Sequence, residues 1–221
     1  MNSHSFTKTY GSQIALTMPD MEWRPGQIYA VIGSNGSGKS TLARVLSGAE
    51  PSDDNKKPLS GGTIGYLPQK PYAFRMRLEK NLYLNGSDHE RAEHLMKALG
   101  LESLRRKRAH RLSGGETAKL ALGRLLMKDY DLLILDEPTA SMDMESTLAA
   151  ETLIQSYREQ TDCAVILITH SLRQAQRIAD RILYFEKGRL IESGDSGRIL
   201  LSPEKTETRR FLQFFGFDNM S

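Results

Sequence analysis

Short apolar runs alternate with longer segments of helical periodicity along most of this chain. Three such runs, at residues 27–32, 132–135 and 163–169, are bounded by Gly or Asp. Buried parallel strands have this nearly continuous apolar character, whereas helices that cover a sheet show a period near 3.6 residues. The helices predicted between and after these strands cover residues 39–47, 143–159 and 171–179. The alternation predicts an α/β fold with a mainly parallel sheet.

A different pattern fills residues 75–127, where strand character disappears. Leu95, Met96 and Leu99 share one side of a helical segment that Gly100 closes. Strand character resumes afterwards, so we predict one domain whose core, about 1–74 and 128–221, brackets a helical subdomain.

The carboxyl-terminal part is predicted from turn and helix patterns. Residues 181–185 and 189–192, joined by Lys187 and Gly188, are typical of a hairpin, and a last helix is expected over about 203–215. That helix and the two residues after it carry four phenylalanines, Phe211, Phe214, Phe215 and Phe217, which either pack on the chain's own sheet or form a docking surface. We expect them to pack on the sheet.

Composition narrows the class of protein. The chain has 221 residues, 39% of them hydrophobic and 26% charged, and a net charge of +3, which excludes a disordered, fibrous or nucleic-acid-packaging protein. No apolar run approaches the roughly 18 residues of a membrane span. The first residues lack a secretory signal, so we expect a cytoplasmic protein. Its single cysteine, Cys163, is expected to be a small core residue.

A glycine-rich loop follows the first predicted core strand. It matches the phosphate-binding pattern G-x-x-x-x-G-K-[ST] and lies between a strand and a helix, the context this pattern needs. Its backbone N–H groups and the helix amino terminus would surround phosphate oxygens, Lys39 would supply positive charge, and Ser40 would bind Mg²⁺. A plain glycine-rich turn is the alternative, which the context disfavours. The loop comprises Gly33, Ser34, Asn35, Gly36, Ser37, Gly38, Lys39 and Ser40, and Thr41 follows.

Two carboxylates and a histidine follow later strands. Asp136 and Glu137 end the run that begins at Leu132, and His170 ends the run after Cys163. The carboxyl ends of parallel strands meet at one edge of the sheet, so these side chains should lie beside the phosphate loop. Asp136 would hold Mg²⁺, Glu137 would polarise the attacking water, and His170 would contact the γ-phosphate. Solvated strand ends or a helix cap would be the ordinary interpretation of each residue alone.

A second anion-binding candidate opens another helix. Ser113, Gly114, Gly115 and Glu116 precede a helical run at 117–127. Flexible backbone amides, a hydroxyl and the helix dipole suit an anion, although the signal is weak by itself.

Together, in kind and order, these motifs resemble the ATP-binding subunits of ABC transporters. The resemblance implies a P-loop NTPase core with a small antiparallel β region and an inserted helical subdomain, and it makes 113–116 the family signature. It also implies that Tyr10 stacks on adenine and that Gln69 joins Ser40 and Asp136 as a metal ligand, with Glu137 as general base. Residues 48–62 are few for the family's antiparallel β region.

The resemblance also implies partners. Two copies would close head to tail, each ATP lying between one chain's phosphate loop and the other chain's signature, and separate transmembrane permease subunits would bind near the helical insert. The chain would then be peripheral at the inner face of the membrane. Residues 66–72, 139–143 and 207–214 are most similar to tungstate-type oxyanion importers, in which a solute-binding protein delivers the solute.

Two other classes compete with transport. A soluble ABC-type ATPase acting on nucleic acid or ribosomes would use a basic run such as 105–108, but such relatives carry coiled-coil arms or a second cassette, and this sequence has neither. A non-catalytic nucleotide sensor would be expected to lack Lys39 or Glu137, and both are present.

Overall fold

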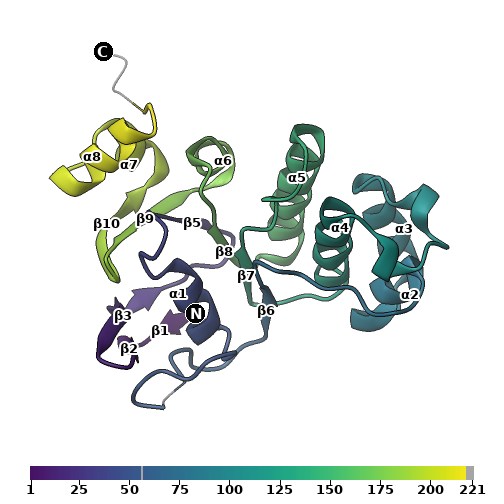
Figure 1. The fold of residues 1–221 in the computed structure, drawn as a ribbon, viewed down its shortest axis with the longest axis horizontal. Helices are drawn as coiled ribbons and strands as arrows, with labels where there is room; N and C mark the ends of the chain where they lie inside the picture. The colour runs from purple at the N-terminus through teal and green to yellow at the C-terminus, as the bar shows by residue number, and fades with distance from the viewer. Residues whose placement is uncertain (56, 218–221) are drawn as a thin grey trace.

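The computed structural model describes residues 1–55 and 57–217 (Figure 1). Its main sheet has eight strands in the order β2-β3-β10-β9-β5-β8-β7-β6. A separate pair joins β1 (Asn2–Ser3) to β4 (Met21–Glu22). The main strands are β2 (Phe6–Tyr10), β3 (Gln13–Met18), β5 (Ile28–Ile32), β6 (Ile64–Leu67), β7 (Leu132–Asp136), β8 (Ala164–Ile168), β9 (Arg181–Glu186) and β10 (Arg189–Asp195).

The centre of the sheet is parallel, as the apolar runs predict. β9, β5, β8, β7 and β6 all pair in parallel, so the carboxyl ends of β5, β7 and β6 meet at one edge. β9 and β10 form the expected hairpin, and Lys187 and Gly188 at its turn have φ of 49° and 75°. Two successive positive φ values match the twist of a tight hairpin.

Antiparallel strands also enter the sheet from the amino terminus. β2 and β3 pair antiparallel and join the main sheet through β10. The described residues between 48 and 62 contain no named strand, and Leu59 makes only an isolated bridge to Ser3. The small antiparallel region therefore lies within residues 2–22, where β2 pairs with β3 and β1 pairs with β4.

Helices cover both faces of the sheet. Alternate residues of β5 point in opposite directions, so Tyr29 and Val31 pack with α1 (Lys39–Leu46), whereas Ala30 and Ile32 pack with α6 (Leu172–Ile178). α5 (Met144–Thr161) packs on that second face beside β7 and β8. Cys163 lies in this core at 1% exposure, and burial raises the pKa of its thiol to about 12, which confirms its expected structural role.

The helical insert lies beyond the β6 edge (Figure 1). It contains α2 (Leu78–Leu82), α3 (His89–Ala98) and α4 (Gly114–Leu125), with short 3-10 segments Tyr83–Asn85, Glu102–Leu104 and Ala109–Arg111. α4 begins three residues before its predicted start, because Ser113 caps it and the glycines are part of its first turn. Among the described residues, no helix is both long and apolar enough to cross a bilayer.

The carboxyl-terminal end differs from its prediction. A short helix α7 (Ser196–Leu201) follows β10 directly, and α8 (Thr206–Phe214) begins three residues after the predicted start. The aromatic cluster is divided between the two roles considered for it. Phe211 packs on Tyr184 of β9 with ring centroids 4.8 Å apart, whereas Phe214 is 84% exposed. The expected packing on the sheet is thus confirmed for Phe211 and wrong for Phe214.

Candidate nucleotide-binding site

The loop between β5 and α1 is shaped by glycines. Gly33 has a φ of 149°, and a side chain there would overlap the carbonyl oxygen of Phe185. Gly38 has a φ of 102°, and a Cβ there would lie 2.8 Å from the carbonyl oxygen of Ala15. Because L residues with side chains rarely adopt these conformations, the sequence needs glycine at both positions.

Two polar groups in this loop are ready for a ligand. Lys39 Nζ donates to the carbonyl oxygens of Gly33 and Ser34, at 2.7 and 2.9 Å. The Ser37 hydroxyl is buried and has no hydrogen-bond partner in the described part of the chain. Buried polar groups are normally paired, so this hydroxyl, with the inward-facing ammonium, fits a phosphate-binding loop.

Burial changes the protonation equilibria of two charged groups beside the loop. Desolvation lowers the pKa of Lys39, although the carboxylates of Glu137 and Asp136 act against it. Burial likewise raises the pKa of Asp136, although a hydrogen bond from Ser40, whose Oγ lies 3.2 Å from Asp136 Oδ1, opposes the shift. An anionic phosphate would favour the charged form of Lys39, and a bound cation would favour the charged form of Asp136.

Glu137 and His170 form a pair at the same sheet edge. His170 Nε2 lies 2.6 Å from Glu137 Oε1, and the Glu137 side chain is 12% exposed. Glu137 has a φ of 53°, a left-handed conformation that costs on the order of 1–3 kcal/mol for a residue with a side chain. Its N–H donates to the carbonyl oxygen of Ile168 at 3.0 Å, which anchors this turn to β8.

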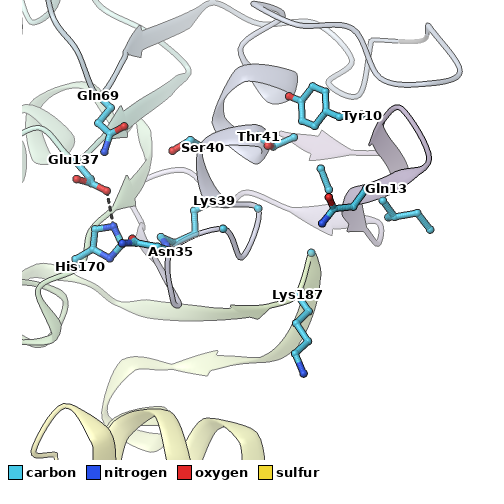
Figure 2. A pocket seen from close by; sticks show the side chains of 15 residues that line it. Tyr10, Gln13, Asn35, Lys39, Ser40, Thr41, Gln69, Glu137, His170 and Lys187 are labelled. Atoms are coloured by element: carbon cyan, nitrogen blue, oxygen red, sulfur yellow. Dashed lines mark ion pairs between the residues drawn. The ribbon is translucent and has the colours of Figure 1, made fainter.

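One pocket of about 680 Å³ brings Lys39, Glu137 and His170 together, whereas Gly33, Ser37 and Asp136 lie behind its wall and do not line it (Figure 2). Tyr10 lies at one end, Glu137, His170 and Gln69 lie at the other, and Lys39 lies between them. The predicted site residues that line it are Tyr10, Asn35, Gly36, Gly38, Lys39, Ser40, Thr41, Gln69, Glu137 and His170. Ser34 lines an adjoining pocket that shares Asn35, Gln69, Glu137 and His170.

Sequence reasoning missed part of the wall. Gln13, Ile14 and Lys187 also line this pocket. Gln13 and Ile14 come from the start of β3, and Lys187 comes from the turn of the β9–β10 hairpin; the fold brings both to the phosphate loop. Nothing in the spacing of these residues could have shown that.

The four residues from Ser113 to Glu116 lie elsewhere. None of them lines the pocket. They form a capping box at the start of α4, in which Glu116 N donates to Ser113 Oγ at 3.2 Å and Ser113 N donates to Glu116 Oε2 at 2.7 Å. A Cβ on Gly115 would lie 2.8 Å from the carbonyl oxygen of Ser141, so this loop packs closely on the segment that follows Pro138.

Comparison with known proteins identifies the family. The family model described as ABC transporter matches residues 16–140. The chain belongs to the ABC transporter family. It is 35% identical over 201 residues to the tungstate uptake system ATP-binding protein TupC of Peptoclostridium acidaminophilum, a match covering 84% of this chain and 94% of that protein. It is 33% identical over 202 residues to the zinc import ATP-binding protein ZnuC of Chelativorans sp. strain BNC1, covering 89% and 69%.

Solved structures agree with the fold. The ATP-binding subunit of an ABC transporter superposes with a TM-score of 0.81 at 21% identity, over 96% of this chain and 98% of that one. A dimeric ATP-binding cassette in a post-hydrolysis state with ADP and Pi gives 0.76 at 21% identity, over 89% and 99%. The chain is therefore an ABC ATPase that binds and hydrolyses ATP, as the resemblance implied, and its α/β P-loop fold is confirmed.

Proposed function

We propose that this ABC ATPase drives solute import through separate membrane subunits. The observation that carries the proposal is the match to a tungstate uptake ATP-binding protein over 94% of that protein's length. The zinc import ATP-binding protein supports import as the shared task, and the tungstate relative favours an oxyanion such as tungstate as the solute. By analogy with these relatives, a solute-binding protein would deliver the solute, and the ATPase would lie at the inner face of the membrane.

The pocket supports specific roles in ATP hydrolysis. Lys39 and the loop amides would bind the phosphates, with Tyr10 against the adenine base. Glu137 would orient and polarise the attacking water, and His170, its partner at 2.6 Å, would hold that carboxylate and contact the γ-phosphate.

A magnesium ion fits the oxygen donors at this sheet edge. Ser40 Oγ and Asp136 Oδ1 lie 3.2 Å apart, and Gln69 lines the same pocket. Mg²⁺ keeps several waters and is bound through one or two carboxylates plus substrate phosphates, so this donor set suffices. Within residues 1–55 and 57–217, no group of three His, Cys, Asp or Glu residues forms an alternative metal cluster. Ser40, Gln69 and Asp136 would hold the ion, which would neutralise charge on the transferred phosphoryl group.

A second copy of the chain would complete the site. The pocket of one chain is not lined by its own residues Ser113 to Glu116. If these residues contact a nucleotide, it would be the nucleotide bound by another copy of the chain. The structural neighbour with ADP and Pi is described as dimeric, which agrees with a pair of copies; the head-to-tail arrangement is our proposal. We infer that ATP binding closes two copies and that hydrolysis reopens them.

A groove beside the helical insert suits a membrane partner. It has a volume of about 520 Å³ and lies between β6 and α4. Tyr72, Phe74 and Leu84 on its wall are 58%, 41% and 50% exposed. The Arg124 guanidinium lies over the Tyr72 and Phe74 rings, at 5.3 and 5.2 Å from their centroids. Because this apolar wall begins three residues after Gln69, a permease segment seated there would be coupled to the nucleotide pocket.

The competing role on nucleic acid or ribosomes has less support. Arg105 pairs with Glu93, and Lys107 Nζ lies 3.0 Å from Glu116 Oε2. Two of the four basic side chains in the run are thus engaged in ion pairs within the chain, which reduces the charge available for phosphates.

Solute uptake in cells tests the proposal. The chromosomal copy is deleted, and intracellular tungsten, molybdenum and zinc are measured by mass spectrometry after restoration with the wild type, Glu137→Gln or Leu84→Asp. We expect wild type alone to restore tungsten uptake. Leu84→Asp should keep ATP binding in vitro but lose co-purification with a multi-span membrane protein. Restored zinc uptake with unchanged tungsten would contradict the oxyanion assignment, and no solute deficit together with co-purifying ribosomes would contradict transport.

A further inference from the structure

The aromatic ring at the adenine end of the pocket is held by charged groups. Tyr10 ends β2 and is 45% exposed, so an isolated ring at this place could turn freely. Its hydroxyl donates to Glu50 Oε2 at 2.8 Å, and Arg44 Nη2 donates to the same hydroxyl at 3.1 Å. Two hydrogen bonds therefore restrain the far end of the ring.

Glu50 connects the groups of this network. Its Oε2 also accepts from Arg44 Nε at 2.9 Å, and its Oε1 lies 3.3 Å from Lys8 Nζ. The Glu50 and Lys8 side chains are only 21% and 13% exposed. Burial acts to raise the pKa of Glu50, but hydrogen bonds from Tyr10, Arg44 and Lys8 outweigh it and leave that pKa lowered. The carboxylate is therefore charged at neutral pH and is a strong acceptor for the tyrosine hydroxyl.

The same hydrogen-bond network extends to the end of the pocket that contains the phosphate loop. Arg44 lies on α1, the helix that begins with Lys39, and its Nη2 also lies 3.3 Å from Thr41 Oγ1 on the pocket wall. Lys8 Nζ lies over the Tyr10 ring, 5.6 Å from its centroid. The orientation of the ring is thus fixed relative to the helix that carries the phosphate loop.

We propose that Glu50, with Arg44 and Lys8, positions Tyr10 for the adenine base and so sets the affinity of the site for ATP. The inference rests on the proposed contact between Tyr10 and adenine. Glu50, Arg44 and Lys8 do not line the pocket, so they act through Tyr10 and are positioning residues. A restrained ring loses less freedom when the base binds, which favours binding.

Nucleotide affinity in a double-mutant cycle tests the inference. Dissociation constants for MgATP and for inorganic tripolyphosphate, which has no base, are measured by calorimetry for Glu50→Gln, Tyr10→Phe, the double variant and Tyr10→Ala. Glu50→Gln and Tyr10→Phe should each weaken ATP binding about 3- to 10-fold, the double variant should be no weaker than either, and Tyr10→Ala should be the weakest. Tripolyphosphate binding should stay within about twofold of wild type, because it lacks the group that Tyr10 would contact.

Controls separate this role from a general loss of folding. Glu22→Gln removes a carboxylate that pairs with Arg24 at 3.0 Å and does not line the pocket, and it should leave ATP binding unchanged. In steady-state assays Glu50→Gln should raise the KM for ATP with little change in kcat. If Glu50→Gln does not fold, Tyr10→Phe tests the same hydrogen bond.

Each contrary result has one meaning. Normal ATP affinity in Glu50→Gln and Tyr10→Phe, with weak binding in Tyr10→Ala, would overturn the inference and leave the base contact of Tyr10 standing. Equal losses for ATP and tripolyphosphate would show that the network acts on the phosphate loop, which also overturns it. Normal ATP binding in Tyr10→Ala would refute the proposed role of Tyr10 and the inference with it.

Discussion

At the scale of single residues, the site depends on a few groups in costly environments. Lys39 and Asp136 are buried, and desolvation favours the neutral form of each: it lowers the pKa of Lys39 and raises the pKa of Asp136. Glu137 adopts a left-handed conformation at the end of β7, where its side chain reaches His170. Strained and desolvated residues persist where function requires them, which agrees with an active site at this edge.

The lysine of the phosphate loop should dominate nucleotide affinity. Lys39→Ala removes the ammonium that now lies 2.7 Å from the Gly33 carbonyl oxygen, so we expect ATP to bind at least about 10-fold more weakly. Lys97→Ala, a change at the last turn of α3, is the matched control and should bind normally. Calorimetry with MgATP measures both, and unchanged affinity in Lys39→Ala would contradict the role given to this lysine.

The sequence predicted these residues better than their conformations. The order of strand, glycine-rich loop and helix was enough to place Lys39 and Ser40, and the run that ends at Asp136 was enough to place Glu137 beside them. The left-handed φ of Glu137 and its contact with His170 depend on how β7 and β8 align. A single sequence does not show that register.

At the scale of elements, the last helices show how one buried carboxylate organises a terminus. Glu192 on β10 accepts from the N–H groups of Glu204 and Lys205, at 3.0 and 3.1 Å, just before α8 begins. It also accepts from Arg198 of α7 at 3.3 Å. These bonds hold α7 and the start of α8 against β10.

Stability should therefore depend on the charge of Glu192. Burial acts to raise the pKa of Glu192, but hydrogen bonds from the N–H groups of Glu204 and Lys205, and the Arg198 charge, leave that pKa lowered. A lowered pKa contributes stability above the pKa of the unfolded chain, and that contribution is lost as the pH falls through the folded value. Glu192→Gln should reduce the free energy of unfolding near pH 7 by about 1–3 kcal/mol, and the difference should shrink in acid.

Urea unfolding at neutral and acidic pH measures this effect. Glu186→Gln, a change at the end of neighbouring β9, is the control and should alter stability little at either pH. A deficit for Glu192→Gln that stays constant as the pH falls would contradict the explanation.

Strands with continuous apolar runs were predictable, and so was the short strand β6, expected at residues 63–67, whereas β2 and α7 were not. β5, β7 and β8 are buried along their whole length and were predicted from their apolar runs. α7 has only six residues, and it is held by the contact between Arg198 and Glu192 of β10, which depends on tertiary structure. β2 has no regular alternation of buried and exposed residues, so the sequence pattern did not predict this strand.

At the scale of the whole molecule, the phosphate loop and the Ser113–Glu116 loop of one chain do not meet. The pocket at the sheet edge includes the phosphate loop, whereas Ser113 caps α4 in the helical insert. A head-to-tail pair would bring each loop to the other chain. The division into core and helical subdomain stays a prediction, and it would supply the two halves of the proposed composite site.

Mixing two inactive variants tests whether the halves act in trans. A Ser113→Arg chain keeps its phosphate loop, and a Lys39→Ala chain keeps its signature. Each should be nearly inactive alone, whereas an equimolar mixture should regain roughly a quarter to a half of wild-type ATPase activity, because mixed dimers contain one intact site. Phosphate release measures the activity. No recovery in the mixture would contradict head-to-tail pairing.

The most direct test of the account is the mass of Glu137→Gln in the presence of MgATP. Without a carboxylate to polarise water, this variant should bind ATP, hydrolyse it at least about 100-fold more slowly than wild type, and accumulate as a closed pair. Light scattering after size exclusion should then change from the 24.8 kDa monomer to twice that mass on addition of MgATP. A double variant that carries both Glu137→Gln and Ser113→Arg should still bind ATP, but its mass should not change on addition of MgATP. A Glu137→Gln chain that stays monomeric at saturating ATP, or that hydrolyses it at the wild-type rate, would contradict the central claim.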